Sequence, residues 1–240
     1  VDKFSAAWVS AWPAPDMWLQ SAEFSEIVCR YFGLPSPACA PLIGLPIGRT
    51  RARLDAHGFN LCSAQLPGGG WRQQHDAIKW VLHDDMREMV TRCTTEVYGL
   101  FAPLLPQGAL NELDAQPKRK RQGIVPDFMV RCRTEEAGPL ADVLVDVKTL
   151  HYGVSTYPIA AERCRAVSRR SAAVDAEYLC KARHLDQRWL DVDEGQTGPV
   201  EAKLRTFGRV RGFVVGSWAE ASPDVDWLLH QVAEMSTLHV

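Results

Sequence analysis

Residues 141–150 carry an alternation of side chains that narrows the possible folds of this chain most strongly. Successive side chains of a β-strand point to opposite faces, so this alternation predicts a strand with two different faces. The alternating residues are Val143, Val145 and Val147 on the first face and Asp142, Leu144, Asp146 and Lys148 on the second. We therefore expect a β-strand with one apolar face and a second face on which two acids and a lysine line up.

Hydrophobic spacing and turn residues predict further elements on both sides of this strand. Turn residues at 134–139 predict a hairpin that joins a strand over 123–132 to the strand over 141–150. The predicted elements are helices over 21–31 and 71–92, strands over 94–100, 123–132 and 141–150, one long helix or two abutting helices over 159–189, a strand over 208–218 and a helix over 223–235, with loops over 103–117 and 191–198. In the helix over 71–92 the residues at helical spacing are Ile78, Val81, Leu82, Met86 and Met89. This order of elements indicates an α/β domain.

The composition agrees with a folded globular protein. Of the 240 residues, 46% are hydrophobic and 23% are charged, which excludes disorder and coiled coil as the main state. Four prolines interrupt the longest apolar stretch, residues 32–48, so it predicts neither a membrane span nor a signal-peptide core. Seven cysteines without a CxxC pair indicate reduced thiols. We therefore expect an intracellular protein, nuclear or cytoplasmic, that does not enter a membrane.

Residues 1–70 differ from the rest of the chain. They are rich in proline, glycine and small residues, and they contain only short helical patterns. Three consecutive glycines at 68–70 mark a break before the amphipathic helix. We therefore expect two parts, an irregular N-terminal region over 1–70 and a domain over 71–240.

Two carboxylates come together if the hairpin pairs in the expected register. Asp127 is the only acid of the strand over 123–132, and 19 positions separate it from Asp146 on the returning strand. Two facing carboxylates repel each other unless a cation binds them, and their hard oxygen atoms suit Mg²⁺ or Mn²⁺. Lys148 on the same face could orient a water molecule or offset negative charge, which predicts phosphodiester hydrolysis. The alternative is an ordinary salt-bridged strand face, and the spacing alone favours neither.

Basic residues form clusters although the formal net charge is only −2. Local basic patches on a nearly neutral chain fit a protein that contacts phosphate groups along one face. For any single cluster the alternative is solvated surface. The clusters are Lys118, Arg119, Lys120 and Arg121; Arg163, Arg165, Arg169 and Arg170; and Lys203, Arg205, Arg209 and Arg211.

The residues Pro126-Asp127, followed after the hairpin by Asp146-Val147-Lys148, resemble the motif of the PD-(D/E)xK nuclease superfamily. The resemblance implies a restriction-endonuclease-like fold, which is an α/β fold with a mixed β-sheet flanked by helices. Upstream, residues 54–62 and 72–78 are similar to the stretch that leads into the restriction-like endonuclease of site-specific non-LTR retrotransposons. Tyr178 and Lys181 match a tyrosine and a lysine that this group often carries on a helix.

These resemblances imply a divalent-metal-dependent endonuclease that hydrolyses DNA and forms the C-terminal part of a mobile-element protein. The valine at position 1 also indicates a fragment of a longer protein. Mg²⁺ or Mn²⁺ would be held by Asp127, Asp146 and the backbone carbonyl of Val147, and Lys148 would serve the attacking water. His75 and Glu96 are further candidates for the catalytic site, although a helix-cap role explains His75 equally well. The expected nucleic-acid contacts, with DNA favoured over RNA, are Arg163, Arg165, Arg169, Arg170, Lys118, Arg119, Lys120, Arg121 and Lys181.

The chain also departs from the retrotransposon pattern. Arg51 and Arg53 stand where the first cysteines of a zinc knuckle are expected, and Asn60 stands at the histidine position. Only Cys62 matches a ligand, so we expect a degenerate knuckle-like segment without zinc. Two other classes of function stay open. One is a non-catalytic nucleic-acid-binding module on a nuclease scaffold, and the other is a structural interaction domain.

Overall fold

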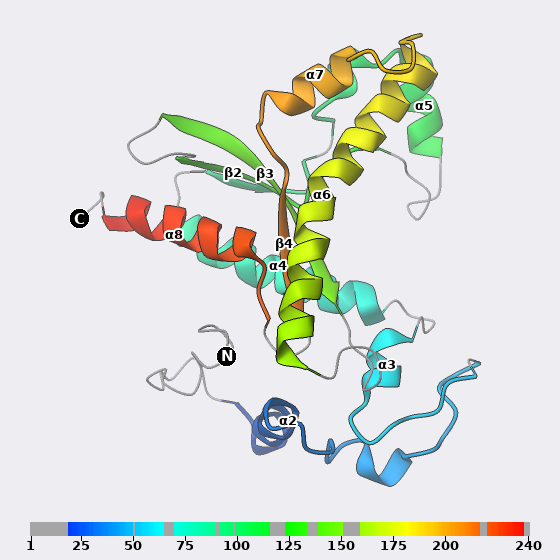
Figure 1. Ribbon diagram of the computed structural model, residues 1–240, viewed down its shortest axis with the longest axis vertical. Helices are drawn as coiled ribbons and strands as arrows, with labels where there is room; N and C mark the ends of the chain where they lie inside the picture. Colours follow the sequence, from blue (N-terminus) through cyan, green and yellow to red (C-terminus); the bar gives the residue numbers. More distant parts are fainter. Residues whose placement is uncertain are drawn as a thin grey trace. The chain divides into compact units, whose positions relative to one another are not determined.

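The fold of the chain was analysed in a computed structural model (Figure 1). It describes residues 19–49, 51–64, 70–89, 92–97, 99–115, 123–133, 139–150, 159–216 and 220–237. The chain divides into two compact units. The first contains residues 1–77, 149–167 and 215–221, and the second contains residues 78–148, 168–214 and 222–240.

A four-stranded sheet with the strand order β1-β2-β3-β4 forms the centre of the fold. The strands are β1 (Cys93–Thr95), β2 (Phe128–Arg133), β3 (Leu140–Leu150) and β4 (Arg211–Gly216). β2 pairs antiparallel with both β1 and β3, whereas β3 reaches β4 through a helical crossover, and the sheet is mixed. The predicted α/β class, the four strands and the hairpin are confirmed, while most of the predicted hairpin turn lies outside the described residues.

The hairpin register decides which side chains share a face. Met129 pairs with Leu144 and Phe128 pairs with Val145, so the two faces of β2 and β3 continue each other. The predicted apolar face of β3 is completely packed, because Val143, Val145 and Val147 are at most 2% exposed. These valines lie on the side of Phe128, and the acids lie on the side of Met129.

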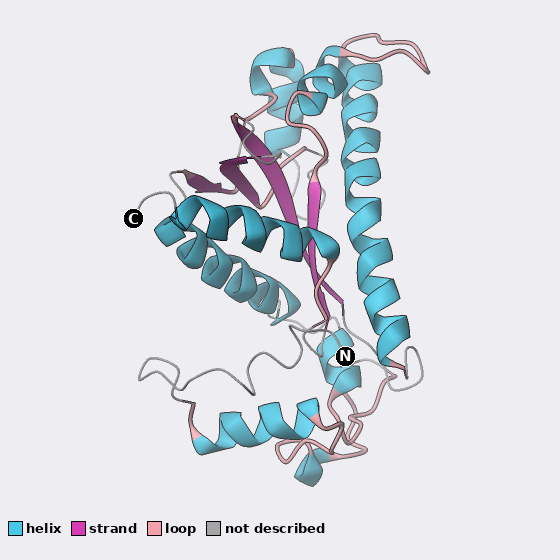
Figure 2. Cartoon of the chain, turned by 60° about the vertical axis from the view of Figure 1, so that its left-hand side comes forward, coloured by secondary structure: helices cyan, strands magenta, loops and turns pink. Residues whose placement is uncertain are grey.

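One long helix, α6 (Ala160–Trp189), follows β3 and settles the choice between one helix and two. In the second unit its apolar side packs on the sheet face that carries Met129 and Leu144. The helix residues in this core recur at helical spacing and are Val174, Tyr178, Ala182 and Leu185. Figure 2 shows the sheet between α6 on one side and the helices α4 (Gly70–Met89) and α8 (Pro223–Thr237) on the other. α8 contacts β2 from that side.

The predicted helix over 71–92 exists as α4, and the apolar pattern identified its buried side only in part. Met86 is buried and Ile78 and Leu82 are half-buried, whereas Val81 is 62% exposed. Lys79 is buried although the pattern did not include it. Lys79 can be buried because its ammonium group forms an ion pair with Glu96. A tertiary contact of a charged residue therefore determines how this helix is oriented.

In the second unit, helical segments lie where none was predicted, and one strand is shorter than predicted. The expected loop over 103–117 contains most of a 3-10 helix, η3 (Ala102–Leu104), and the helix α5 (Gln107–Ala115), and α7 (Pro199–Arg205) follows the loop over 191–198. Prolines suggested loops here, yet proline is well tolerated at the start of a helix, where its missing N–H has no intrahelical role. β1 ends early because Glu96 has a φ of 45°, which turns the backbone out of the extended conformation.

The first unit contains α2 (Ser21–Tyr31), a short 3-10 helix η2 (Ala40–Leu42) and α3 (Phe59–Ser63). The helix predicted over 21–31 is confirmed. Cys39, Ile47 and Leu54 form a small core.

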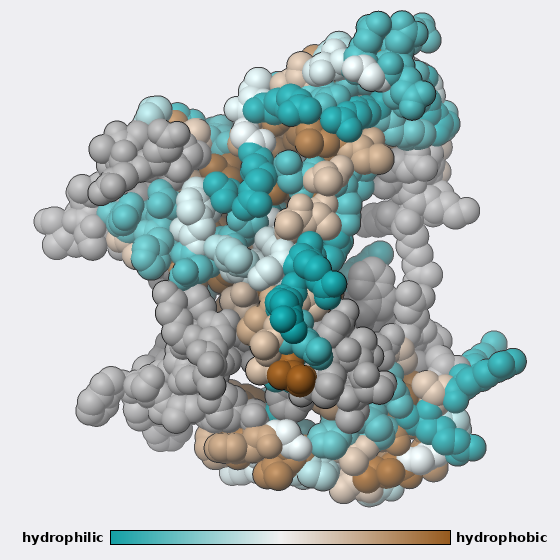
Figure 3. Space-filling view, viewed as in Figure 1, coloured by the Kyte–Doolittle hydropathy of each residue, from teal (hydrophilic) through white to brown (hydrophobic). Residues whose placement is uncertain are grey.

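Figure 3 shows hydrophilic side chains over much of α6 and α7. Within the described residues, the helices are too short or too polar to cross a lipid bilayer.

Candidate active site on the acidic face of the sheet

The end of the β2–β3 ladder brings two carboxylates together in the second unit. Phe128 pairs with Val145 at the end of the ladder, and Asp127 and Asp146 are the next residue on each strand. The Val147 backbone N–H donates a hydrogen bond of 2.8 Å to Oδ2 of Asp127, which fixes the position of this carboxylate. The Asp127 carboxylate therefore lies against the backbone of the residue that follows Asp146.

The two oxygen atoms of the buried Asp146 carboxylate have different partners. The residue is only 5% exposed. Its Oδ1 accepts a hydrogen bond of 2.8 Å from the Tyr178 hydroxyl. Its Oδ2 forms an ion pair with the Lys148 ammonium group, but it accepts no hydrogen bond from any described residue. The ammonium group compensates the charge of this buried oxygen, so the side chain of Lys148 supplies a cation beside it.

Tyr178 connects α6 to the acidic face. Its hydroxyl lies 2.8 Å from Asp146 and 3.2 Å from the carbonyl oxygen of Val125, and the charged, closer acceptor takes its proton. Burial raises the pKa of Tyr178 far above its usual value, and the Asp146 carboxylate raises it further. The Lys181 ammonium group lies 4.9 Å from the centre of the Tyr178 ring. Tyr178 thus reaches the site from α6, and the exposed Lys181 lies against its ring.

The raised pKa of Tyr178 predicts that the protein loses stability at alkaline pH. In the unfolded chain this tyrosine releases its proton near pH 10, whereas the folded protein keeps it protonated, so rising pH favours the unfolded state. Above about pH 10 the free energy of unfolding should fall by up to about 1.4 kcal/mol per pH unit from this group. Urea unfolding of the wild type and of Tyr178→Phe between pH 8 and about pH 11.5 measures this contribution. If the free energy of unfolding fell equally with pH in the two proteins, the result would contradict this contribution of Tyr178.

Glu96 and Lys79 lie at the same end of β1. The backbone N–H of Glu96 donates a hydrogen bond of 2.9 Å to the carbonyl oxygen of Asp127, and its carboxylate pairs with the buried Lys79. Glu96 is thus next to the predicted site, as the sequence suggested. Lys79 was missed, because its helical spacing to His83 and Met86 does not by itself show that this side of α4 is buried.

The remaining predicted residues fall into three groups. His75 belongs to the first unit, where its Nδ1 lies 3.3 Å from Oδ1 of Asp76. In the arginine cluster of α6, Arg163 pairs with the buried Glu220 and Arg170 pairs with Glu177, whereas Arg165 and Arg169 are exposed. The hydrogen bond from Arg170 lowers the pKa of Glu177. The cluster at 118–121 lies outside the described residues.

The donor atoms of this site fit a hard divalent cation that keeps several water ligands. Mg²⁺ is commonly held by one or two carboxylates, with water and substrate oxygen atoms completing its shell. Asp127 and Asp146 supply such carboxylates, and one oxygen of Asp146 already lies beside the cationic Lys148. Nowhere in the described part of the chain do three or more histidine, cysteine or acidic side chains form a metal-binding group. Any bound Mg²⁺ would therefore depend on these two carboxylates, the backbone and water.

Cys62, the single match to a zinc knuckle, has a cationic neighbour in the first unit. The Arg30 guanidinium donates a hydrogen bond of 3.5 Å to its sulfur atom. A cation at this place disfavours a second cation on the same thiol. We expect elemental analysis of the purified protein to find no stoichiometric zinc and expect the fold to survive a chelator. One zinc per chain would contradict this prediction.

Searches with this chain found no matching family model, no matching curated protein and no matching solved structure.

Proposed function

We propose that the chain is a divalent-metal-dependent endonuclease that hydrolyses phosphodiester bonds of DNA. The observation that carries this proposal is the hydrogen bond that holds the Asp127 carboxylate at the backbone of Val147, next to Asp146, with Lys148 paired to one oxygen of Asp146. The order of these residues resembles the PD-(D/E)xK motif, and Tyr178 meets the same face from α6, with Lys181 against its ring. The mixed sheet between helices is compatible with a restriction-endonuclease-like fold.

Each side chain of the site has a chemical task in this proposal. Asp127 and Asp146 would hold Mg²⁺ or Mn²⁺, which supplies positive charge against the phosphate and lowers the pKa of a bound water molecule. The Val147 N–H fixes Asp127, and the Tyr178 hydroxyl fixes Asp146, so neither carboxylate has to reorganise during the reaction. The Lys148 ammonium group can orient the attacking water and offset the negative charge that develops on the phosphate oxygens.

Cleavage of supercoiled plasmid DNA tests this function. The wild type should produce nicked or linear DNA with Mg²⁺ or Mn²⁺ and none with a chelator. Lys148→Ala should cleave at a small fraction of the wild-type rate but still bind Mn²⁺ in a calorimetric titration, because an ammonium group is not a metal ligand. Cleavage that persists in Asp127→Ala would identify a contaminating nuclease and contradict the assignment.

One observation favours a second function, a nucleic-acid-binding module without catalysis. Lys148 already pairs with Asp146, so the buried carboxylate has a counter-charge without any metal ion. Such a protein would bind DNA but leave plasmid intact at every metal concentration. The plasmid assay combined with a DNA-binding measurement therefore separates the two functions.

The exposed arginines of α6 should contribute to DNA binding in either case. Arg165 and Arg169 lie one helical turn apart, and neither forms an ion pair with a described residue. Replacing both by glutamine should weaken binding to unrelated duplexes alike, because phosphate contacts carry no sequence information. A plot of the logarithm of the DNA association constant against the logarithm of the salt concentration should have a slope that is less negative by about two. Arg183→Gln is the control, since this guanidinium already pairs with the buried Glu201 and Arg205 still pairs with that carboxylate in the variant. An unchanged slope in the first variant would remove this part of α6 from the interface.

A further inference from the structure

The first unit contains a cavity of about 240 Å³, lined by residues of α2, of the segment over 34–39 and of 57–62. An engineered apolar cavity of about 150 Å³ holds benzene, and the pockets of drug-sized ligands measure about 300–1,000 Å³. The cavity of the first unit therefore has room for a ligand of intermediate size. The candidate active site uses none of the residues that line it.

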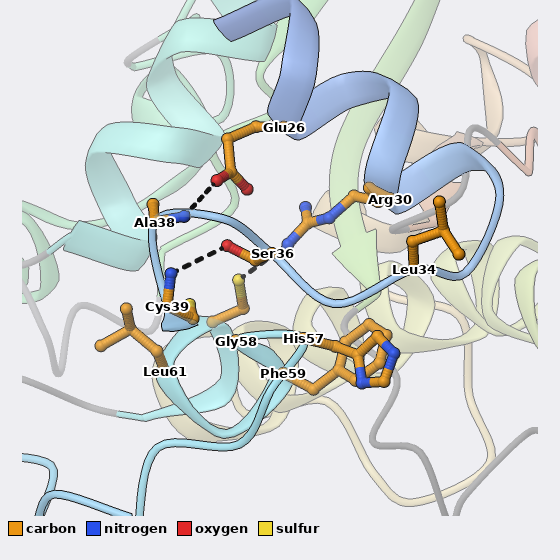
Figure 4. Close-up of a pocket in the computed structure, with 11 residues that line it drawn as sticks. Glu26, Arg30, Leu34, Ser36, Ala38, Cys39, His57, Gly58, Phe59 and Leu61 are labelled. Atoms are coloured by element: carbon orange, nitrogen blue, oxygen red, sulfur yellow. Dashed lines mark hydrogen bonds between the residues drawn. The ribbon is translucent and has the colours of Figure 1, made fainter. Parts of the chain in front are cut away.

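Two side chains of opposite charge, Glu26 and Arg30, reach the cavity wall from α2. They are one helical turn apart, a spacing at which glutamate and arginine often form an ion pair. Here each turns to a different partner, as Figure 4 shows. Oε1 of Glu26 accepts a hydrogen bond of 2.6 Å from the Ala38 N–H, and Nη2 of Arg30 donates one of 3.5 Å to the Cys62 sulfur atom. The cavity wall thus presents an anionic and a cationic group that are held apart.

Both charged groups keep binding capacity for a ligand. The half-buried Arg30 guanidinium carries several N–H donors, its sulfur partner is a weak acceptor, and no carboxylate of the described residues pairs with it. Oε2 of the half-buried Glu26 likewise has no hydrogen-bond partner among the described residues. Charged groups withdrawn from water are stabilised by opposite charges. A ligand with a carboxylate for Arg30 and an ammonium group for Glu26 would satisfy both.

The rest of the cavity wall includes large apolar side chains. Leu34 is 50% exposed and Leu61 is 43% exposed. Phe59 is buried, and its ring stacks on that of His57 with 5.5 Å between the ring centres. Removal of exposed apolar surface from water is favourable, so the two leucines favour a ligand with an apolar body.

We propose that this cavity binds a free α-amino acid with an apolar side chain. The ligand carboxylate pairs with Arg30, the ligand ammonium group pairs with Glu26, and the ligand side chain lies on Leu34 and Leu61. A ligand with only one of the two charges would cover the other charged group of the protein without pairing it, which is costly. The inference does not depend on the proposed nuclease function.

Calorimetric titration of the whole chain with L-leucine tests the proposal. Two analogues isolate the charges, because 4-methylpentanoate has the leucine skeleton without the ammonium group and 3-methylbutylamine has it without the carboxylate. We expect leucine to bind at one site per chain. Each analogue should bind at least about tenfold more weakly, since one hydrogen-bonded charged group contributes that much to affinity.

Two variants assign the charges of the ligand to the two residues. Glutamine at position 26 can still accept the Ala38 N–H, so Glu26→Gln keeps the contact between α2 and the segment over 34–39. This variant should bind leucine and 4-methylpentanoate with similar affinity, because the ammonium group has lost its partner. Arg30→Gln should bind leucine and 3-methylbutylamine with similar affinity, because the carboxylate has lost its partner.

Arg49→Gln is the control, because Arg49 is an exposed arginine of the first unit that does not line the cavity. It should bind leucine as the wild type does. The proposal is overturned if the wild type shows no saturable binding of leucine, or if leucine and its two analogues bind with equal affinity. It is also overturned if Glu26→Gln and Arg30→Gln, shown by circular dichroism to be folded, bind leucine as tightly as the wild type.

Discussion

Replacement of Asp146 by asparagine is expected to reduce Mg²⁺-dependent DNA cleavage at least about 1,000-fold, which corresponds to about 4 kcal/mol of lost transition-state stabilisation. Asparagine has nearly the same shape as aspartate, and its side-chain oxygen can still accept the hydrogen bond of the Tyr178 hydroxyl. It lacks the negative charge that would bind the cation. The initial rate of plasmid cleavage at saturating Mg²⁺ measures the effect, and circular dichroism verifies the fold.

Asp142→Asn is the matched control for this variant. Asp142 lies on the same face of β3, where its carboxylate lies 3.4 Å from the Arg131 guanidinium, and it is only partly buried. Its replacement should change the cleavage rate by no more than about twofold, because a partly exposed ion pair contributes little. If both variants lost activity equally, or if Asp146→Asn cleaved DNA at the wild-type rate, the active site would be assigned to the wrong residues.

Replacement of Gly212 by alanine is expected to lower the free energy of unfolding by about 3 kcal/mol, and hence the melting temperature by roughly 6–12 °C. Gly212 lies in β4 where this strand meets α6. A Cβ atom there would be 2.7 Å from both Cα and the carbonyl oxygen of Ser171. These are backbone atoms of a helix, so they cannot move away as the end of a flexible side chain could. The Gly212 N–H also donates a hydrogen bond of 3.0 Å to the buried Asp224, which any shift of β4 would disturb.

Gly108→Ala provides the corresponding control. Gly108 lies in the first turn of α5, and no neighbouring atom lies within 4 Å of the position that a Cβ atom would take. Alanine favours helix and restricts the unfolded chain, so this variant should keep the wild-type stability or gain up to about 1 kcal/mol. Urea unfolding of both variants tests the pair of predictions. A neutral Gly212→Ala would show that β4 and α6 do not pack as closely as described.

Local patterns predicted most of the elements correctly. The alternation around Val145 defined β3 and its buried face, and turn residues before it predicted the hairpin. The hairpin then brought Asp127 to the backbone next to Asp146, because a register between two strands joined by a short connection has few alternatives. Elements with weak periodicity, such as α5 and α7, were missed, since proline suggests a loop and the start of a helix equally well.

The sequence by itself therefore determined the strands, the helical character of residues 159–189 and the acidic face of the hairpin, because these depend on residues a few positions apart. That these residues form one helix and not two was shown by the structure. Only the tertiary structure decided which groups meet across the chain. It buried Lys79 beside Glu96, brought the Tyr178 hydroxyl to Asp146, and paired Arg163 with Glu220. The physical reason is that burial and ion pairing depend on contacts between residues distant in sequence, which no local periodicity encodes.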